Sequence, residues 1–182
     1  MPSVHDVVVV PLSIDHWDAL SALFETSAGV NGCWCVWPRR EPMTHRPDPV
    51  GNKAEMKTLL IAGEVPGLVA LSGERAIGWC AFGPRSRYPQ YENEDEIEPA
   101  WAIPCLYIER SADRALVGRV LIEAAAELAT SSGAVALDGP PSWWLSGDAD
   151  AVASVTALFL ANGVGRVGTG ARMPKLRRLL RG

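Results

Sequence analysis

Long apolar runs are absent from this chain of 182 residues, and a helix needs about 20 consecutive apolar residues to span a bilayer. A secretion-signal pattern is absent from its first residues as well, so we expect a cytoplasmic protein that does not contact membranes. Positive charge is also limited: 17 Lys and Arg stand against 21 Asp and Glu, which gives a net charge of −4. That balance argues against non-specific binding to nucleic acid.

Histidine and cysteine are few, with three and four copies. Four cysteines in a chain of this length do not make the disulfide framework of a small secreted protein, so we expect reduced thiols. Cys33 and Cys35 have one residue between them, whereas structural zinc sites commonly have two to four residues between paired cysteines. The sequence therefore predicts no metal site. A Gly-x-Ser-x-Gly motif is absent too, which leaves nucleophilic serine chemistry unsupported.

What remains is the composition of a globular protein, with 48% apolar residues and neither an internal repeat nor a linker. We expect residues 1–182 to form one domain with one core. Apolar alternation and a 3.6-residue period predict the elements. The predicted strands are 6–10, 67–71, 76–82, 104–108, 135–137 and 164–167, and the predicted helices are 14–24, 53–61, 116–128 and 151–161. Residues 172–180 suit a closing strand or a short helix.

The segment Ile103–Gly139 reads as a strand, a turn, an amphipathic helix and a second strand. A helix that begins at the carboxyl end of a strand directs free backbone N–H groups into the space above the sheet. Such a helix start favours an anion, and phosphate is the common example.

This segment resembles the GNAT N-acetyltransferases, and the resemblance extends along nearly the whole chain. It takes in Gly32–Trp37, Ile77–Arg85, Trp101–Cys105 and Ala157–Gly163. The resemblance implies an α/β (α+β) GNAT fold, in which a mixed, mostly antiparallel sheet splays between the strands at 104–108 and 135–137. Helices should cover both faces of that sheet.

The resemblance also implies acetyl-coenzyme A as co-substrate, with its pyrophosphate on a turn of pattern Arg/Gln-x-x-Gly-x-Gly/Ala. In this chain Asp113 stands at the Arg/Gln position, Leu116 at the first glycine and Gly118 at the last. Asp113 suits a helix cap that would compete with pyrophosphate, so a well-capped helix start is the alternative interpretation. The implied cofactor contacts are Leu106, Tyr107, Ile108, Asp113, Arg114, Ala115, Leu116, Val117, Gly118, Arg119 and Phe159.

The acceptor and the proton-transfer groups are predicted from three places. Trp34, Trp37 and Arg39 offer flat apolar area and a cation for an acceptor pocket, or else the tryptophans only pin their loop to the core. Glu96 and Glu98, in an acidic run, are the candidate bases. Phe159 stands where many GNAT enzymes have a proton-donating tyrosine.

Two functions are consistent with this pattern. The first is an N-acetyltransferase that acts on a small-molecule or peptide amine, with a homodimer possible. The second is a GNAT-fold ligand-binding or regulatory module that has lost turnover, which the altered turn and Phe159 favour. Neither hypothesis involves a membrane or a nucleic acid.

Overall fold

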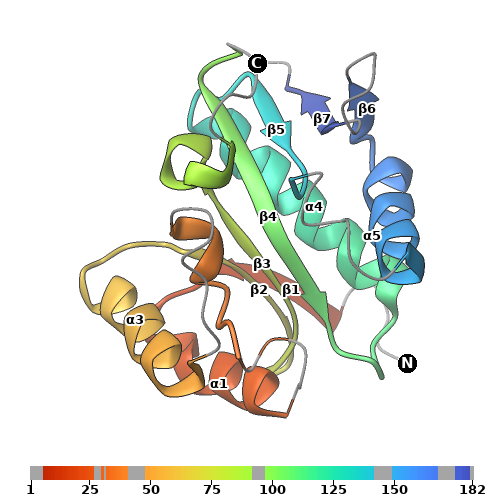
Figure 1. The fold of residues 1–182 in the computed structure, drawn as a ribbon. Helices are drawn as coiled ribbons and strands as arrows, with labels where there is room; N and C mark the ends of the chain where they lie inside the picture. The colour runs from red at the N-terminus through yellow and green to blue at the C-terminus, as the bar shows by residue number, and fades with distance from the viewer. Residues whose placement is uncertain are drawn as a thin grey trace.

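The computed structural model describes residues 6–26, 30, 32–40, 48–91, 97–141, 149–167 and 175–180, with the backbone alone for 149–152. It contains one seven-stranded sheet in the order β1-β2-β3-β4-β5-β7-β6 (Figure 1). The strands are β1 Val7–Pro11, β2 Gly67–Ser72, β3 Arg75–Pro84, β4 Ala100–Ile108, β5 Ala136–Asp138, β6 Gly165–Val167 and β7 Lys175–Leu179. The α-helices are α1 Trp17–Glu25, α3 Pro49–Ile61, α4 Arg114–Ser131 and α5 Ala149–Ala161. No helix in these ranges is long and apolar enough to cross a membrane.

The predicted splay is present at the junction of β4 and β5. These two strands form the parallel pair of a sheet whose other pairs are antiparallel. Their pairing begins at Ala100 with Ala136 and ends at Ala102 with Asp138. Because β4 continues to Ile108 while β5 stops, the two strands diverge and leave a wedge at the edge of β4.

A bulge lies where β4 leaves β5. Ala81 pairs with Cys105 and Gly83 with Ala102, so β4 carries one residue more than β3 across this interval. Pro104 lies within the bulge and has no N–H to leave unpaired. Beyond the bulge the Glu109 N–H donates to the Ile77 carbonyl. Since backbone groups alternate along an antiparallel strand, those of Leu106 and Ile108 face the open edge of β4.

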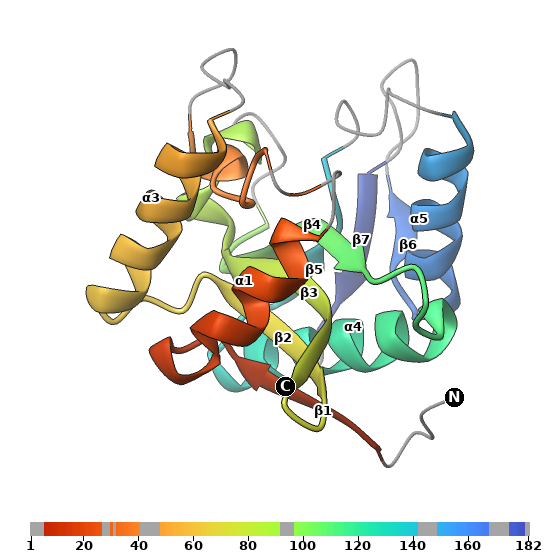
Figure 2. The ribbon, with the colours of Figure 1, turned by 90° about the horizontal axis from the view of Figure 1, so that it is seen from below.

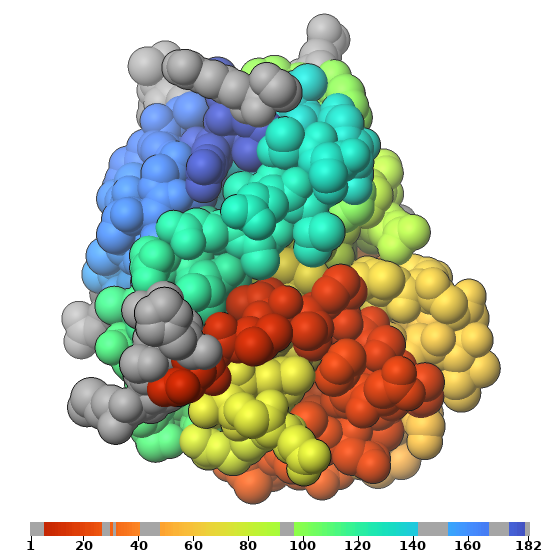
Figure 3. All heavy atoms as spheres, turned by 180° about the vertical axis from the view of Figure 1, so that it is seen from behind, coloured from red at the N-terminus to blue at the C-terminus, as the bar shows by residue number. Residues whose placement is uncertain are grey.

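The helices cover both faces of the sheet, as the resemblance to the GNAT proteins implied. In Figure 2, α1 and α3 lie on one side of the sheet and α4 on the other. Figure 3 shows α4 running across its face with α5 beside it. Two cores result. The first joins α4 and α5 to the sheet through Val117, Leu121 and Phe159, and the second joins α1 and α3 through Phe24 and Met56.

Several elements differ from their predicted extent. The strand predicted at 104–108 begins at Ala100, because Ala100–Ala102 pair with β5. The helix predicted at 53–61 begins earlier, at Pro49, because the Asp48 carboxylate caps it by accepting from the Gly51 N–H. After β3, where no helix was predicted, the chain forms two single-turn 3-10 helices, η4 Arg85–Arg87 and η5 Pro89–Tyr91. Residues 175–179 form a strand, which decides between the two forms predicted for the end of the chain.

Candidate functional site

The candidate site is the wedge between β4 and β5, where the strand with the open edge leads into the longest helix. At the lower end of β4 in Figure 1, the chain turns through residues 109–113 and enters α4. The open-edge backbone groups of Leu106 and Ile108 therefore precede, by a few residues, the free N–H groups of a helix of 18 residues. Hydrogen-bond donors and the positive end of a helix dipole meet at this point.

Asp113 is the N-cap of α4. Its carboxylate accepts from the Leu116 N–H at 3.1 Å, and its carbonyl accepts from the Val117 N–H at 2.9 Å. Two of the donors at the helix start are thus used by the chain itself. The first-turn donors that remain for an anion are those of Arg114 and Ala115, both exposed. The capping role proposed for Asp113 is confirmed, and its carboxylate lies at the position where pyrophosphate is predicted.

Gly118 and Val117 have packing roles in this helix. A Cβ on Gly118 would lie 2.5 Å from Leu158 Cδ2, so the missing side chain lets α5 approach α4 closely. Val117 is fully buried against the sheet, near Gly78. Arg119 lies one residue further on and is 3.6 Å from Glu123. Contacts of these three residues with coenzyme A stay a prediction.

Phe159 is fully buried in the core beside Gly139, the residue that follows β5. The Tyr91 hydroxyl also reaches Gly139, where it donates to the carbonyl at 2.8 Å. A buried phenol from η5 therefore lies at the end of β5, close to the wedge. No pattern in the sequence pointed to Tyr91. Tyr107, one of the implied cofactor contacts, meets the ring of Phe24 edge-on, with the ring centroids 6.5 Å apart.

The loop at 32–37 is anchored by Trp34. This side chain is 1% exposed, stacks on Trp17 at 5.7 Å and meets Phe24 edge-on at 5.2 Å. Trp34 and Cys35 have φ values of 47° and 51°, which a side chain disfavours, at a cost of order 1 kcal/mol each. The geometry therefore gives Trp34 the core-anchoring role. Trp37, by contrast, is half-buried at the start of η3 Trp37–Arg39.

Arg39 is half-buried and already has a partner of opposite charge. Its Nη1 lies 3.2 Å from Glu64 Oε2, which Arg87 also contacts at 3.2 Å. The guanidinium lies over the ring of Tyr88, 5.6 Å from its centroid. The ion pair with Glu64 and the ring of Tyr88 therefore hold Arg39 in place. Contacts of Arg39 and Trp37 with an acceptor stay a prediction.

Of the candidate bases, Glu96 lies outside the described residues and Glu98 is engaged in contacts. One oxygen of Glu98 accepts from Arg85 at 2.6 Å, and the other accepts from the Ala100 N–H at 2.7 Å. Desolvation raises the pKa of Glu98, but the Ala100 N–H and Arg85 outweigh it, and the pKa lies below its usual value. Glu98 is therefore a weaker base than a free glutamate. Its role as a base stays a prediction.

Glu98→Gln should destabilise the protein at neutral pH by less than about 1 kcal/mol, because the side chain is 55% exposed. A lowered pKa of Glu98 stabilises the folded protein at pH values above 4.5, the ordinary pKa of the group. That stability is lost as the pH falls through the lower pKa that Glu98 has in the folded protein. Urea unfolding over an acidic pH series should show the gap between variant and wild type shrinking below pH 4.5. A gap that does not change with pH would contradict this account.

A buried charge cluster that the sequence analysis missed lies where the wedge begins. Asp138 ends β5 and is 2% exposed, and its carboxylate accepts from Arg85 at 3.0 Å and from Arg177 Nη2 at 2.8 Å. Arg85 joins Asp138 to Glu98, so the cluster ties η4, β5 and β7 together. Asp138 directly follows the apolar run Ala134–Leu137, and a charge in that position was the available signal.

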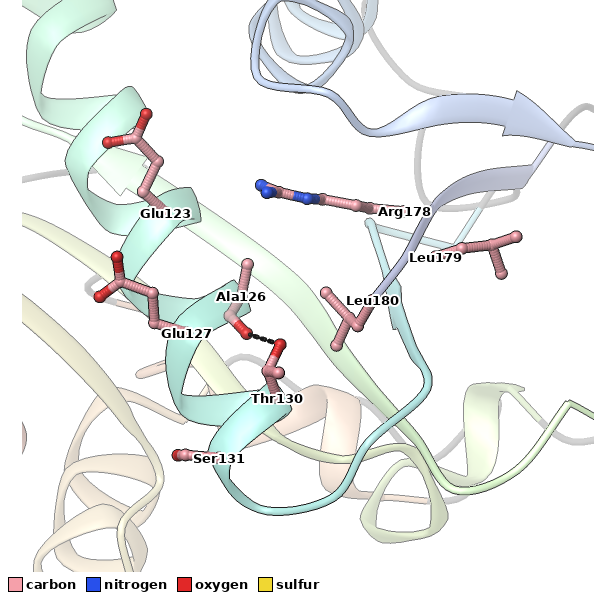
Figure 4. A pocket seen from close by; sticks show the side chains of 8 residues that line it. All are labelled: Glu123, Ala126, Glu127, Thr130, Ser131, Arg178, Leu179 and Leu180. Carbon is pink, nitrogen blue, oxygen red and sulfur yellow. Dashed lines mark hydrogen bonds between the residues drawn. The ribbon is translucent and has the colours of Figure 1, made fainter. Parts of the chain in front are cut away.

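A separate groove of about 580 Å³ lies between the outer face of α4 and the end of β7. Figure 4 shows Arg178 reaching into it from β7, with Glu123 and Glu127 on α4. Glu123 is nine residues beyond Arg114, or roughly 13 Å along the helix. The groove is therefore distinct from the wedge. Among the described residues no group of three His, Cys, Asp or Glu side chains is placed to hold a metal ion.

Solved structures with the same fold are numerous, although no family model and no curated protein matches the sequence. An acetyltransferase of the GNAT family from Streptococcus pneumoniae is 14% identical over 96% of this chain and 99% of its own, with a TM-score of 0.58. The PaiA N-acetyltransferase of Thermoplasma acidophilum, in complex with coenzyme A, is 12% identical over 95% and 98%, with a TM-score of 0.57. An aminoglycoside N-acetyltransferase, AAC(6')-Iy, in complex with coenzyme A, is 16% identical over 91% and 92%, with a TM-score of 0.61.

These similarities define the fold of the chain. It is the α+β fold of the GNAT acetyltransferases, with the wedge between β4 and β5 at its centre.

Proposed function

We propose that this protein is an N-acetyltransferase that transfers an acetyl group from acetyl-coenzyme A to an amine. The observation that carries the proposal is the wedge: an open strand edge at Leu106 and Ile108, directly followed by the start of α4. Chains of this fold have been solved with coenzyme A or acetyl-coenzyme A. We further propose one domain over residues 1–182, a cytoplasmic location and a possible homodimer.

The residues of the wedge fit a thioester co-substrate with one conflict. The N–H groups of Leu106 and Ile108 are placed to donate along the open edge, which is where an elongated amide chain and a thioester carbonyl find partners. The N–H groups of Arg114 and Ala115 and the charge of Arg114 suit a pyrophosphate. The Asp113 carboxylate opposes it. Acetyl-coenzyme A, when bound, supplies an activated acetyl group and a thiol leaving group.

The remaining chemistry needs a base for the amine and, optionally, an acid for the thiolate. Glu96 and Glu98 remain the proposed bases, acting directly or through water. Coenzyme A is a moderately good leaving group because a thiol has a pKa near 8.5. The thiolate can therefore leave without a proton donor, and a phenylalanine at position 159 is compatible with turnover. As contacts of the acceptor we propose Trp37 and Arg39.

A second function is favoured by the capping of α4. A GNAT-fold module that binds a ligand without turnover would tolerate a carboxylate at the helix start, and Asp113 occupies one donor there.

For the acetyltransferase, we propose a small-molecule or peptide amine as the acceptor. The solved neighbours include enzymes named for aminoglycoside, polyamine and agmatine acetylation and a complex bound to a peptide.

Calorimetric titration with coenzyme A separates the two functions. Asp113→Asn removes the charge beside the pyrophosphate position and keeps a capping side chain. Two unit charges several ångströms apart interact by roughly 2 kcal/mol at an effective dielectric of 20, and solvent and salt reduce this to about 1 kcal/mol. The variant should therefore bind coenzyme A about fivefold more tightly than the wild type. Arg114→Ala should bind it more weakly, and both effects should grow at low salt.

Removal of a carboxylate charge elsewhere on the same helix gives the control. Glu127→Gln lies on the exposed face of α4, far from its start, and should leave the affinity unchanged. If neither the wild type nor Asp113→Asn binds coenzyme A or acetyl-coenzyme A at millimolar concentration, the acetyltransferase proposal fails.

A further inference from the structure

Two thiols from distant parts of the chain meet in the core on the α1 and α3 side of the sheet. The Sγ atoms of Cys35 and Cys105 are 3.0 Å apart, although the residues are separated by 70 positions. Both side chains are buried, with exposures of 1% and 4%. Since a disulfide has a sulfur–sulfur distance of about 2.05 Å, the two atoms need to move together by only about 1 Å to bond.

Both thiols are held in this position by rigid surroundings. Cys105 lies on β4 opposite Ala81, in the strand whose other edge opens into the wedge. Cys35 follows the buried Trp34 in the loop 32–37, and Trp34 and Cys35 both have positive φ angles in the left-handed region. The side chain of Trp34 is packed between α1 and α3, so Cys35 has little freedom to move away from β4.

We propose that Cys35 and Cys105 form a disulfide under oxidising conditions, which fixes the loop 32–37 to β4. With a peroxide as oxidant, one thiolate attacks the peroxide oxygen and becomes a sulfenic acid. The second thiolate then displaces that hydroxyl, which leaves as water. Two thiols and one hydrogen peroxide thus give one disulfide and two waters. This modification does not depend on the proposed function.

The surroundings also set the rate and specificity of the reaction. The neighbouring thiol of Cys105 and burial raise the pKa of Cys35, so thiolate is scarce and oxidation is slow. Cys33 is half-buried, and its Sγ lies 3.4 Å from the Cys35 N–H. Cys80 lies in the core on the opposite face of the sheet. The bond therefore joins Cys35 to Cys105 and leaves the other two thiols free.

The test is oxidation of the folded full-length protein with hydrogen peroxide, followed by alkylation of the denatured protein and peptide mapping. The wild type should lose two hydrogen atoms in mass and yield a peptide pair joined through Cys35 and Cys105. Closing a loop of this length should raise the melting temperature by on the order of 10 °C, and a reductant should reverse the rise. Cys33→Ser and Cys80→Ser should form the same bond, whereas Cys105→Ser should not.

Two outcomes would overturn the proposal. One is a wild-type protein that keeps four alkylatable thiols after prolonged oxidation. The other is a bond between Cys33 and Cys35, which would show that the contact seen at 3.0 Å does not direct the chemistry. Because the thiol count and the peptide map of the wild type together decide the matter, a variant that fails to fold does not affect the conclusion.

Discussion

Asp138→Asn should lower the melting temperature by roughly 10 °C and leave the fold otherwise intact. Arg85 and Arg177 are 5% and 4% exposed, and both donate to the Asp138 carboxylate. Removing one partner of a buried ion pair leaves uncompensated charge and costs about 3–5 kcal/mol. In a protein of this size each kcal/mol corresponds to about 2–4 °C. Thermal unfolding followed by circular dichroism measures the change.

Two further variants test the cause. Asp113→Asn makes the same chemical change at an exposed cap and should shift the melting temperature by less than about 2 °C. Arg177→Met in the background of Asp138→Asn removes a buried cation that no longer faces the Asp138 carboxylate, and should recover part of the loss. A double variant that is less stable by the sum of the two single effects would argue against a coupled cluster.

Trp34→Ala should have an effect of similar size, a loss of about 3–5 kcal/mol of unfolding free energy. The indole is 1% exposed and contacts Trp17 and Phe24, so its removal leaves a large cavity between α1 and α3. The strained backbone at Trp34 and Cys35 loses its main anchor at the same time. Equilibrium unfolding in urea should show a lower midpoint.

Trp37→Ala is the matched control, because it changes the same residue type in the same loop at a half-buried position. It should cost clearly less stability than Trp34→Ala. If the two variants are equally stable, the tryptophans do not differ as the structure indicates. In a working acetyltransfer assay, Trp37→Ala should also raise the acceptor KM, whereas a loss of stability alone would leave the KM unchanged.

Local patterns in the sequence predicted the parts of the fold that depend on neighbours in the chain. Apolar periodicity places β4, α4 and β5 in order, and the type and position of Asp113 predict a helix cap, which the hydrogen bond from the Leu116 N–H confirms. The resemblance to GNAT proteins supplied the splay between β4 and β5, which the pairing at Ala102 and Asp138 confirms. The order of the elements and the cap follow from backbone geometry and side-chain spacing over short stretches.

Other features required the tertiary structure because their partners are far apart in the chain. Asp138 meets Arg85 and Arg177 across 53 and 39 positions, and no local pattern pairs a strand-ending aspartate with those two arginines. The contact between Cys35 and Cys105 is equally distant. Trp34 was assigned two possible roles from sequence, and burial gives it the role of an anchor, since exposure depends on what packs above a residue.

The sequence by itself determined the order of the elements and the cap at the start of α4, and its resemblance to the GNAT proteins implied the class of the fold. Local propensity, capping and periodicity are properties of short segments, and each segment carries them wherever it is placed. Only the tertiary structure decided which charges share a buried site, which tryptophan anchors its loop, and which thiols touch. Those outcomes depend on strand register and on the packing of helices against the sheet, which bring together residues that no spacing rule connects.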